Sequence, residues 1–232
     1  MNTHPEGGIL LVFGGEELFL LPSRSLWWPG RRILFVADLH LGKSRSFHQF
    51  GIPVPDCSPT DTGRLAGVIT QLNIEQCFVL GDLIHDEFSV DPNLLHNIEN
   101  LISTTSLNSL HIIRGNHDRH TKQIEKIPDV IWHDENYQIG PFYLRHHPPE
   151  SAGSIENKSP HVIHGHIHPG TMIQAGSGRG GRFPCFVLED STRLILPALG
   201  TFTGLQPVRP SKRRQIFPVI EGNVMRWPPR SR

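Results

Sequence analysis

Cysteine is scarce in this sequence. Only Cys57, Cys77 and Cys185 occur among 232 residues, an odd number without paired spacing. Three cysteines that are far apart and odd in number fit a reducing cytosol better than a disulfide framework or a zinc knuckle. We therefore expect three free, half-buried thiols in a protein of the reducing cytoplasm.

Long hydrophobic runs are missing too. No apolar stretch approaches the ~20 residues of a membrane-spanning helix. The first residues, MNTHPEGG, lack the basic and apolar parts of a secretion signal. No module that reads base edges is present, so we expect any contact with nucleic acid to be independent of its sequence. These absences predict a cytoplasmic protein that does not associate with membranes.

An excess of charge of either sign is absent, since 22 basic residues balance 22 acidic ones. The balance is uneven along the chain, because seven of the basic residues lie at 209–232 beside a single acidic residue, Glu221. We interpret residues 1–208 as the body of one domain and residues 209–232 as its basic C-terminal strand or tail. Such a tail either contacts a polyanion such as DNA or is a solvated end.

Apolar runs in the first half predict alternating strands and helices. The runs RILFVAD from 32, CFVLGD from 77 and LHII from 110 are typical of strands covered on both faces. Apolar residues at helical spacing lie between the first two runs, at 61–72, and the pair Asp91–Pro92 predicts the start of a second helix.

Short strands and turns dominate residues 1–30 and the chain beyond 128. Among the turns, EGN at 221–223 predicts a hairpin. Together the two halves predict an α/β fold with two mixed β-sheets packed as a sandwich and flanked by helices.

Five of the predicted strands end in side chains that can bind a metal ion. These side chains belong to Asp38 and His40, to Asp82, to Asn116 and His117, to His146 and His147, and to His164, His166 and His168. Ligands of open α/β sheets gather at the carboxyl ends of the strands, so neighbouring strands would place these side chains in one cluster. A single histidine at a strand end is usually a structural residue, but five coincident strand ends favour a common site.

The chemistry of this cluster predicts transition metals. The candidate ligands are Asp38, His40, Asp82, Asn116, His146, His166 and His168. Their oxygen and imidazole donors do not suit a thiolate metal and are too rich in nitrogen for calcium or magnesium alone, so manganese, iron, zinc or cobalt fits best. Because this set exceeds the needs of one ion, we expect two divalent ions about 3.5–4 Å apart, sharing a carboxylate and a water of lowered pKa.

A rival interpretation concerns ADLHLGKS at 37–44, which fits a loose phosphate-loop pattern after a buried strand. Such a loop turns its backbone N–H groups toward phosphates, so it favours glycine and excludes carboxylates. Asp38 and the three bulky residues after it would repel or crowd the anion, and a helix starting at Lys43 soon meets Pro53. The sequence therefore argues against nucleotide binding by this loop.

The motifs DLH at 38–40, GD at 81–82, GNHD at 115–118, HHP at 146–148 and GHIH at 165–168 resemble, in this order, the motif set of the calcineurin-like metallophosphoesterases. The resemblance spans most of the chain and implies the metallophosphoesterase fold. It also implies residue roles: Asp38, His40 and His168 hold one metal, Asn116, His146 and His166 hold the other, and Asp82 bridges them. His117 is implied to be the general acid, and Asp118 to orient it.

The choice of one metal ligand stays open between two adjoining histidines, His146 and His147. We prefer His146 to His147, because the ligand of the family usually stands two residues before a proline, here Pro148. His147 and His164 are then expected to contact the substrate or to support a ligand.

Basic residues flank the candidate ligands. Lys43 and Arg45 are expected to contact substrate phosphates. Arg114 and Arg119 either do the same or pair with a nearby carboxylate, for which Asp118, Asp129 and Asp134 are the candidates.

Further stretches, among them WWPGRRILFVADLHLGKS, VLGDLIHDEF and LPALGTFTG, resemble the bacterial ligase-associated branch of this family. The branch implies a manganese-dependent DNA endonuclease and phosphodiesterase of DNA repair, functionally linked to a DNA ligase, a helicase and an exonuclease. Two alternatives stay open: hydrolysis of a small nucleotide or phosphodiester, and a non-catalytic scaffold on the same fold. The presence of His117, the implied proton donor, argues against the scaffold.

Overall fold

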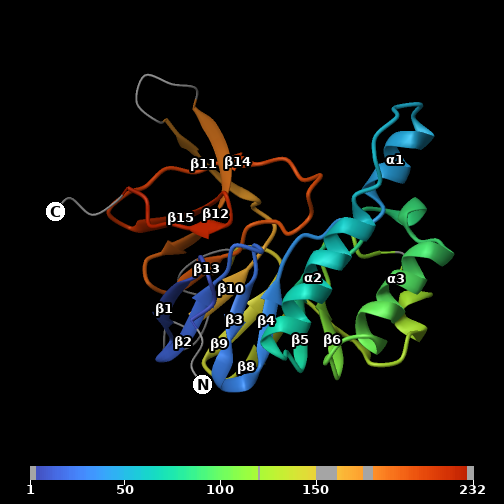
Figure 1. Cartoon of the computed structure of the whole chain (residues 1–232), viewed down its shortest axis with the longest axis horizontal. Coiled ribbons are helices and arrows are strands. Elements are labelled where there is room, and N and C mark those ends of the chain that lie inside the picture. The colour runs from blue at the N-terminus through green and yellow to red at the C-terminus, as the bar shows by residue number, and fades with distance from the viewer. Residues whose placement is uncertain (1–3, 120, 150–160, 175–179, 229–232) are drawn as a thin grey trace.

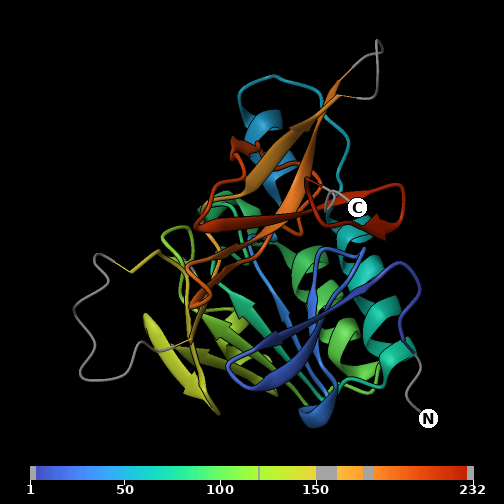
Figure 2. The same ribbon diagram turned by 90° about the vertical axis from the view of Figure 1, so that its left-hand side faces the viewer.

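The computed structural model describes residues 4–119, 121–149, 161–174 and 180–228. Two mixed β-sheets pack face to face, and helices α2 and α3 cover the outer face of the first sheet (Figure 1). The predicted α/β sandwich is therefore confirmed. Figure 2 shows the same molecule from the side of the second sheet, with the hairpin of β11 and β12 extending from the body.

The first sheet contains seven strands in chain order. They are β1 (Ile9–Phe13), β2 (Glu16–Leu20), β3 (Leu26–Trp28), β4 (Ile33–Val36), β5 (Gln76–Leu80), β6 (Ser109–Ile113) and β7 (Val130–His133). The strands from β1 to β4 pair antiparallel, whereas those from β4 to β7 pair in parallel. Every residue of β4 and β6 is buried, which explains the continuous apolar sequence of β4; in β6 the polar residues Ser109 and His111 are buried as well.

The second sheet is formed by the rest of the chain. Its strands are β8 (Asn136–Ile139), β9 (Phe142–Arg145), β10 (His161–His164), β11 (Pro169–Ile173), β12 (Gly181–Glu189), β13 (Arg193–Ile195), β14 (Gln206–Pro207), β15 (Arg214–Ile220) and β16 (Asn223–Val224). Strand β10 lies between β9 and β13 and runs parallel to both. The predicted EGN turn joins β15 to β16, with Glu221 and Gly222 both in left-handed backbone conformations.

Three α-helices and three short 3₁₀ turns complete the described fold. They are α1 (Lys43–Gln49), α2 (Ser58–Leu72), α3 (Pro92–Ser103), η1 (Pro29–Arg31), η2 (Glu87–Ser89) and η3 (Ile124–Lys126). As predicted, Asp91 caps α3: its Oδ1 accepts a hydrogen bond from the backbone N–H of Leu94 at 2.8 Å. None of the described helices is long and apolar enough to cross a membrane.

Two apolar layers hold the fold together. Between the first sheet and the helices, Leu65 and Ile69 of α2 and Ile98 of α3 pack on the parallel strands. Between the sheets, Phe35 of β4 packs against Phe142 of β9 with ring centroids 6.4 Å apart. Cys77 lies in the first of these layers, and Cys185 lies in a third, smaller apolar cluster with Val187 and Ile216. All three cysteines are free, as expected, but Cys77 and Cys185 are completely buried rather than half-buried.

The basic C-terminal segment contributes a strand to the second sheet, where β15 pairs with β12. Arg213 donates to the carboxylate of Asp190 with an Nη2–Oδ2 distance of 2.6 Å, and Arg214 pairs with Glu189. The guanidinium of Arg226 lies over the ring of Phe217. Part of the charge of this segment is therefore neutralised by acidic residues of the body.

Candidate metal centre

The carboxyl ends of the parallel strands bring the candidate ligands together. Because β4, β5 and β6 are paired in parallel, the loops after them emerge at one edge of the first sheet. The backbone N–H of Asp38 donates to the carbonyl of Gly81 at 3.1 Å, which joins the first two loops. The parallel pair β9–β10 brings His146 and His166 from the second sheet to the same place.

The structure brings together one group of candidate ligands, Asp38, His40 and His168. The Nε2 atoms of His40 and His168 lie 3.4 Å apart, and Nε2 of His168 lies 3.4 Å from Oδ1 of Asp38. Asp38 and His40 are buried, and Nδ1 of His40 is a buried ring nitrogen without a hydrogen-bond partner in the described structure. These three side chains converge on a space suited to one ion.

A second group consists of Asn116, His146 and His166. Nε2 of His146 lies 3.0 Å from Oδ1 of Asn116 and 3.0 Å from Nδ1 of His166. The other ring nitrogen of His146 donates to the carbonyl oxygen of Leu80 at 3.0 Å. This contact fixes the tautomer and leaves Nε2 free to bind a metal, as is usual for metal-binding histidines. His146 and His147 both form a group with His166 in which the ligand atoms lie within 4.8 Å of one another, and His146 is the one of the two that also contacts Asn116.

Asp82 lies between the two groups. Its Oδ2 is 3.7 Å from Nε2 of His40 and 3.4 Å from Nε2 of His146. Its Oδ1 accepts a hydrogen bond from the backbone N–H of His117 at 3.0 Å. A carboxylate in this position can bridge two ions.

Electrostatics favour the protonation state that metal binding needs at Asp82 and His40, but not at His146. Despite burial, contacts with the carboxylates of Asp82 and Asp38 raise the pKa of His146, so a metal ion would have to displace its Nε2 proton. Burial also raises the pKa of Asp82, but contacts with protonated His146, with the backbone N–H of His117 and with His40 outweigh burial and lower it to about 2. Burial lowers the pKa of His40 to about 3, despite the opposing charge of Asp82. An ionised carboxylate and a neutral imidazole are the forms that bind a metal.

The backbone is strained at this site. Five of the seven candidate ligands have φ between 46° and 69°, in the left-handed region: Asp38, His40, Asp82, His166 and His168. This conformation costs a non-glycine residue about 1 kcal/mol or more and is often found at functional sites. These strained conformations lower the stability of the fold, but they direct the five side chains toward one point.

Two glycines make the close approach of the strand ends feasible. A Cβ atom at Gly81 would lie 2.1 Å from Nδ1 of His146, and φ of Gly81 is +81°. A Cβ atom at Gly165 would lie 2.8 Å from Oδ2 of Asp38. Larger residues at either position would push a candidate ligand out of place.

The donor set fits a pair of divalent transition metals. Two carboxylates, one amide oxygen and four imidazoles form overlapping groups in which the ligand atoms of the histidines and carboxylates lie within 4.8 Å of one another. Such mixed oxygen and nitrogen donors suit manganese, iron, zinc or cobalt. The residues that sequence reasoning selected as ligands are thus brought together by the fold.

His117 and Asp118 differ in their contacts. Nδ1 of His117 donates to the carbonyl oxygen of His85 at 2.5 Å. The Asp118 carboxylate, only 2% exposed, accepts from the backbone N–H groups of Gly115 at 2.9 Å and Ile84 at 3.2 Å. We expected Asp118 to orient His117, and the structure shows that it holds the backbone of the loop instead of contacting the ring.

His85 is the residue that sequence reasoning missed. Its ring stacks on that of His117 with centroids 5.1 Å apart and an interplanar angle of 18°. His40, His85 and His117 also form a group of imidazoles close enough to share an ion. The signal was the position of His85, three residues after the ligand Asp82 at the end of β5.

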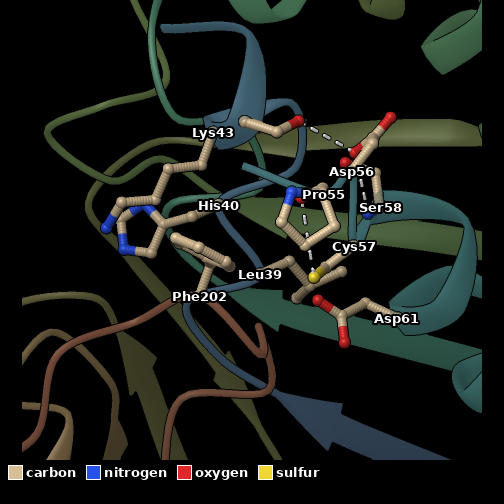
Figure 3. A pocket seen from close by; sticks show the side chains of 10 residues that line it. Leu39, His40, Lys43, Pro55, Asp56, Cys57, Ser58, Asp61 and Phe202 are labelled. Carbon is tan, nitrogen blue, oxygen red and sulfur yellow. Dashed lines mark hydrogen bonds between the residues drawn. The ribbon is translucent and has the colours of Figure 1, made fainter. Parts of the chain in front are cut away.

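The flanking basic residues divide into two kinds. Arg45 pairs with Asp91, and Arg114 pairs with Glu125 at 2.8 Å, a partner outside those expected. Lys43 extends beside His40 along a small hollow that Phe202 also lines (Figure 3). Arg119 is exposed, directly after the GNHD motif. Lys43 and Arg119 are therefore the better placed to meet substrate phosphates.

The two remaining histidines lie in different surroundings. His147 is exposed at the rim, with its ring centroid 4.4 Å from that of His166. His164 is 1% exposed, and its Nδ1 donates to the carbonyl of Gly165 at 3.0 Å. Among the described residues His164 belongs to none of the ligand groups, so its contacts are those of a structural residue.

The loop after β4 cannot act as a phosphate loop. The backbone N–H groups of Asp38, His40 and Leu41 donate to carbonyl oxygens of the loop after β5, at 2.9–3.1 Å. They are therefore not available to an anion. The helix that starts at Lys43 is seven residues long, as the nearby glycine and prolines led us to expect.

The profile of the calcineurin-like phosphoesterases matches residues 31–167, from the start of β4 to the residue before His168. This chain belongs to the calcineurin-like phosphoesterase family. It is thus a member of a family of hydrolases that use divalent metals.

Among solved structures, the nuclease MPE of Pseudomonas putida is 31% identical to this chain, with a TM-score of 0.75 over 94% of this chain and 99% of that one. A protein of unknown function from Aquifex aeolicus, AQ665, is 18% identical to this chain. Its TM-score is 0.42, over 59% of this chain and 78% of that one. No curated protein sequence matches the chain.

Proposed function

We propose that this protein is a dinuclear-metal phosphodiesterase that cleaves DNA, with manganese as its metal. The observation that carries the proposal is the position of Asp82, whose Oδ2 lies within 3.7 Å of ring nitrogens from both ligand groups. The similarity to a solved nuclease over 94% of the chain supports the choice of DNA as substrate.

Each part of the site has a task in this reaction. When bound, two divalent ions stabilise the charge on the phosphoryl oxygens and lower the pKa of the attacking water. The two ligand groups would hold one ion each, with the carboxylate of Asp82 between the two groups. His117 donates its Nδ1 hydrogen to a carbonyl, so Nε2 is the atom that can protonate the departing alkoxide.

DNA is recognised through its backbone in this account. Lys43, next to His40, and the exposed Arg119 supply positive charge at the site, and such contacts with phosphates carry no sequence information. Affinity is therefore expected to fall as salt rises. We further propose a role in cytoplasmic DNA repair, linked to a DNA ligase, a helicase and an exonuclease; this part rests on the resemblance to the ligase-associated branch.

Supercoiled plasmid is the substrate that tests the proposal. The protein, manganese and plasmid are incubated beside two controls, a chelator and the variant His117→Ala. Nicked and linear DNA that requires both metal and His117 supports the proposal. If the plasmid stays intact while bis(p-nitrophenyl) phosphate is hydrolysed, the protein is a phosphodiesterase, but its substrate is a small phosphodiester and not DNA. A chain with neither activity would be the scaffold of the second alternative.

A further inference from the structure

A groove of about 420 Å³ opens beside the second ligand group. It is lined by Arg114, Glu135, Arg145, His147, Pro148 and Pro149, and reaches the candidate ligand His146. We call it the His147 groove. Pockets for small molecules are typically ~300–1,000 Å³ in volume. By contrast, the hollow beside Lys43 has about 10 Å³ of space, about enough for one water molecule.

The His147 groove adjoins the place where a phosphate would react. The ring centroid of His147 lies 4.7 Å from that of His146 and 4.4 Å from that of His166, and both neighbours are candidate ligands. A group that fills the groove is therefore next to a phosphate held at the metal centre. This proximity suits the part of a substrate that is bonded directly to the scissile phosphate.

Charges in the groove are balanced. Arg114 is paired: its Nη2 lies 2.8 Å from Oε1 of Glu125, and its guanidinium lies over the ring of Trp132, 4.6 Å from the centroid. Arg145 and Glu135 both line the groove, so its lining carries charges of both signs. A second phosphate would meet Glu135 as well as Arg145, so a neutral group with a polar edge fits better than another anion.

The surfaces of the groove suit a flat ring. Pro148 and Pro149 are apolar, while His147 and the guanidinium of Arg114 are planar groups on which bases can stack. Arg145 provides hydrogen-bond donors and Glu135 acceptors, a combination that every nucleobase edge can engage. We propose that the His147 groove binds the nucleobase on one side of the scissile phosphate, an inference that rests on the proposed phosphodiesterase chemistry.

Three chromogenic esters with the same leaving group test the inference. They are the p-nitrophenyl esters of thymidine 5′-monophosphate and thymidine 3′-monophosphate, and methyl p-nitrophenyl phosphate, which has neither a base nor a second ring. Stacking of one base is worth about 1–3 kcal/mol, so we expect kcat/KM of one thymidine ester to exceed that of the base-free ester by about tenfold or more. Arg145→Gln removes the charge and shortens the reach of the hydrogen-bond donors, so it should reduce this preference several-fold and affect the base-free ester much less. Arg182→Gln is the control, because Arg182 donates to the carbonyl of Leu205 on a different part of the sheet.

Equal kcat/KM for all three esters, or an equal loss on all three in Arg145→Gln, would overturn the inference. If plasmid stays intact while one thymidine ester is preferred, the proposed DNA substrate fails and the groove stands. If no ester is hydrolysed, binding of thymidine monophosphate, measured by calorimetry with manganese present, replaces turnover. If the native protein and Arg145→Gln then bind thymidine monophosphate with equal affinity, binding of the nucleobase in the His147 groove is contradicted. A weaker affinity of the variant alone would support it.

Discussion

Nδ1 of His117 lies 2.5 Å from the carbonyl oxygen of His85. Because a carbonyl can only accept, Nδ1 carries the hydrogen and Nε2 is left to face the substrate. The carbonyl itself is fixed, since the backbone N–H of His85 donates to the carbonyl of Leu41 at 3.1 Å. The proposed proton donor His117, which follows β6, is therefore oriented by a backbone carbonyl of the segment that follows β5.

Replacing His117 by alanine should impair turnover according to the leaving group. General acid catalysis is typically worth ~10²–10⁴ in rate, and an alkoxide leaving from DNA needs the proton far more than p-nitrophenolate does. We expect a loss of this size on DNA and a much smaller loss on bis(p-nitrophenyl) phosphate, with unchanged metal content. Steady-state rates on both substrates and metal analysis measure this. An equal loss on both would show that His117 acts otherwise.

His85→Ala removes a ring and keeps the carbonyl that accepts from His117. The stacked pair of imidazoles, at 5.1 Å, is lost, and such ring pairs are worth about 0.5–1.5 kcal/mol. We expect turnover of DNA to fall by up to about tenfold, far less than in His117→Ala, with the same dependence on the leaving group. Parallel rates of the two variants on DNA and the chromogenic diester provide the measurement. A loss as large as that of His117→Ala would instead assign the His85 ring a direct part in the reaction.

Gly81→Ala should weaken metal binding. The new Cβ atom would lie 2.1 Å from Nδ1 of His146, and alanine disfavours the φ of +81° found there. We expect a large loss of manganese affinity in calorimetry. Gly63→Ala is the matched control, because a Cβ atom at Gly63 in α2 has no neighbour within 4 Å. In a helix this change is expected to stabilise the protein by about 0.5–1 kcal/mol and to leave affinity unchanged. Equal manganese affinities in the two variants would contradict the packing argument.

A pair of histidines away from the metal centre, buried His111 and half-buried His133, predicts a pH dependence of stability. Nδ1 of His111 lies 2.9 Å from Nε2 of His133, and burial, with the neighbouring His133, lowers the pKa of His111 from 6.5 to about 4. Between these values the unfolded chain binds a proton that the folded chain excludes. The free energy of unfolding therefore falls as pH drops through this window and is fully present above about 6.5.

The variant His111→Gln tests this pH effect in metal-free protein. The variant should be the less stable one at pH 7.5, because it loses the stack of His111 on Phe78, whose centroids are 4.3 Å apart. The native protein and the variant should differ less in their free energy of unfolding at pH 4.5 than at pH 7.5, by at most about 3 kcal/mol. Denaturant titrations of both proteins at both pH values measure this. A difference that stays constant with pH would exclude the pair of histidines as its source.

Local patterns explain what the sequence could predict. Continuous apolar runs followed by polar residues marked β4, β5 and β6, and the residues just after them are the candidate ligands. The cap of α3 was equally visible, because Asp91 and Pro92 adjoin the helix they begin. The predicted start of α2 at 61 was three residues late, since Pro59 is acceptable in a first turn.

Contacts between distant segments explain what the sequence could not predict. Arg45 looked free to bind phosphate, but it pairs with Asp91, far away along the chain. Asp118 directly follows His117, yet its carboxylate turns toward the backbone N–H groups of Gly115 and Ile84, which would otherwise be unsatisfied. The hydrogen-bond partner of His117 is the backbone carbonyl of His85. Because every residue has a backbone carbonyl, the type of residue 85 could not indicate this contact.

Anomalous diffraction from manganese-soaked crystals tests the central claim, that five strand ends form one dinuclear centre. The account predicts two manganese peaks about 3.5–4 Å apart. One should lie among Asp38, His40 and His168, the other among Asn116, His146 and His166, with Asp82 contacting both. A single peak, or two peaks that do not share Asp82, would contradict it.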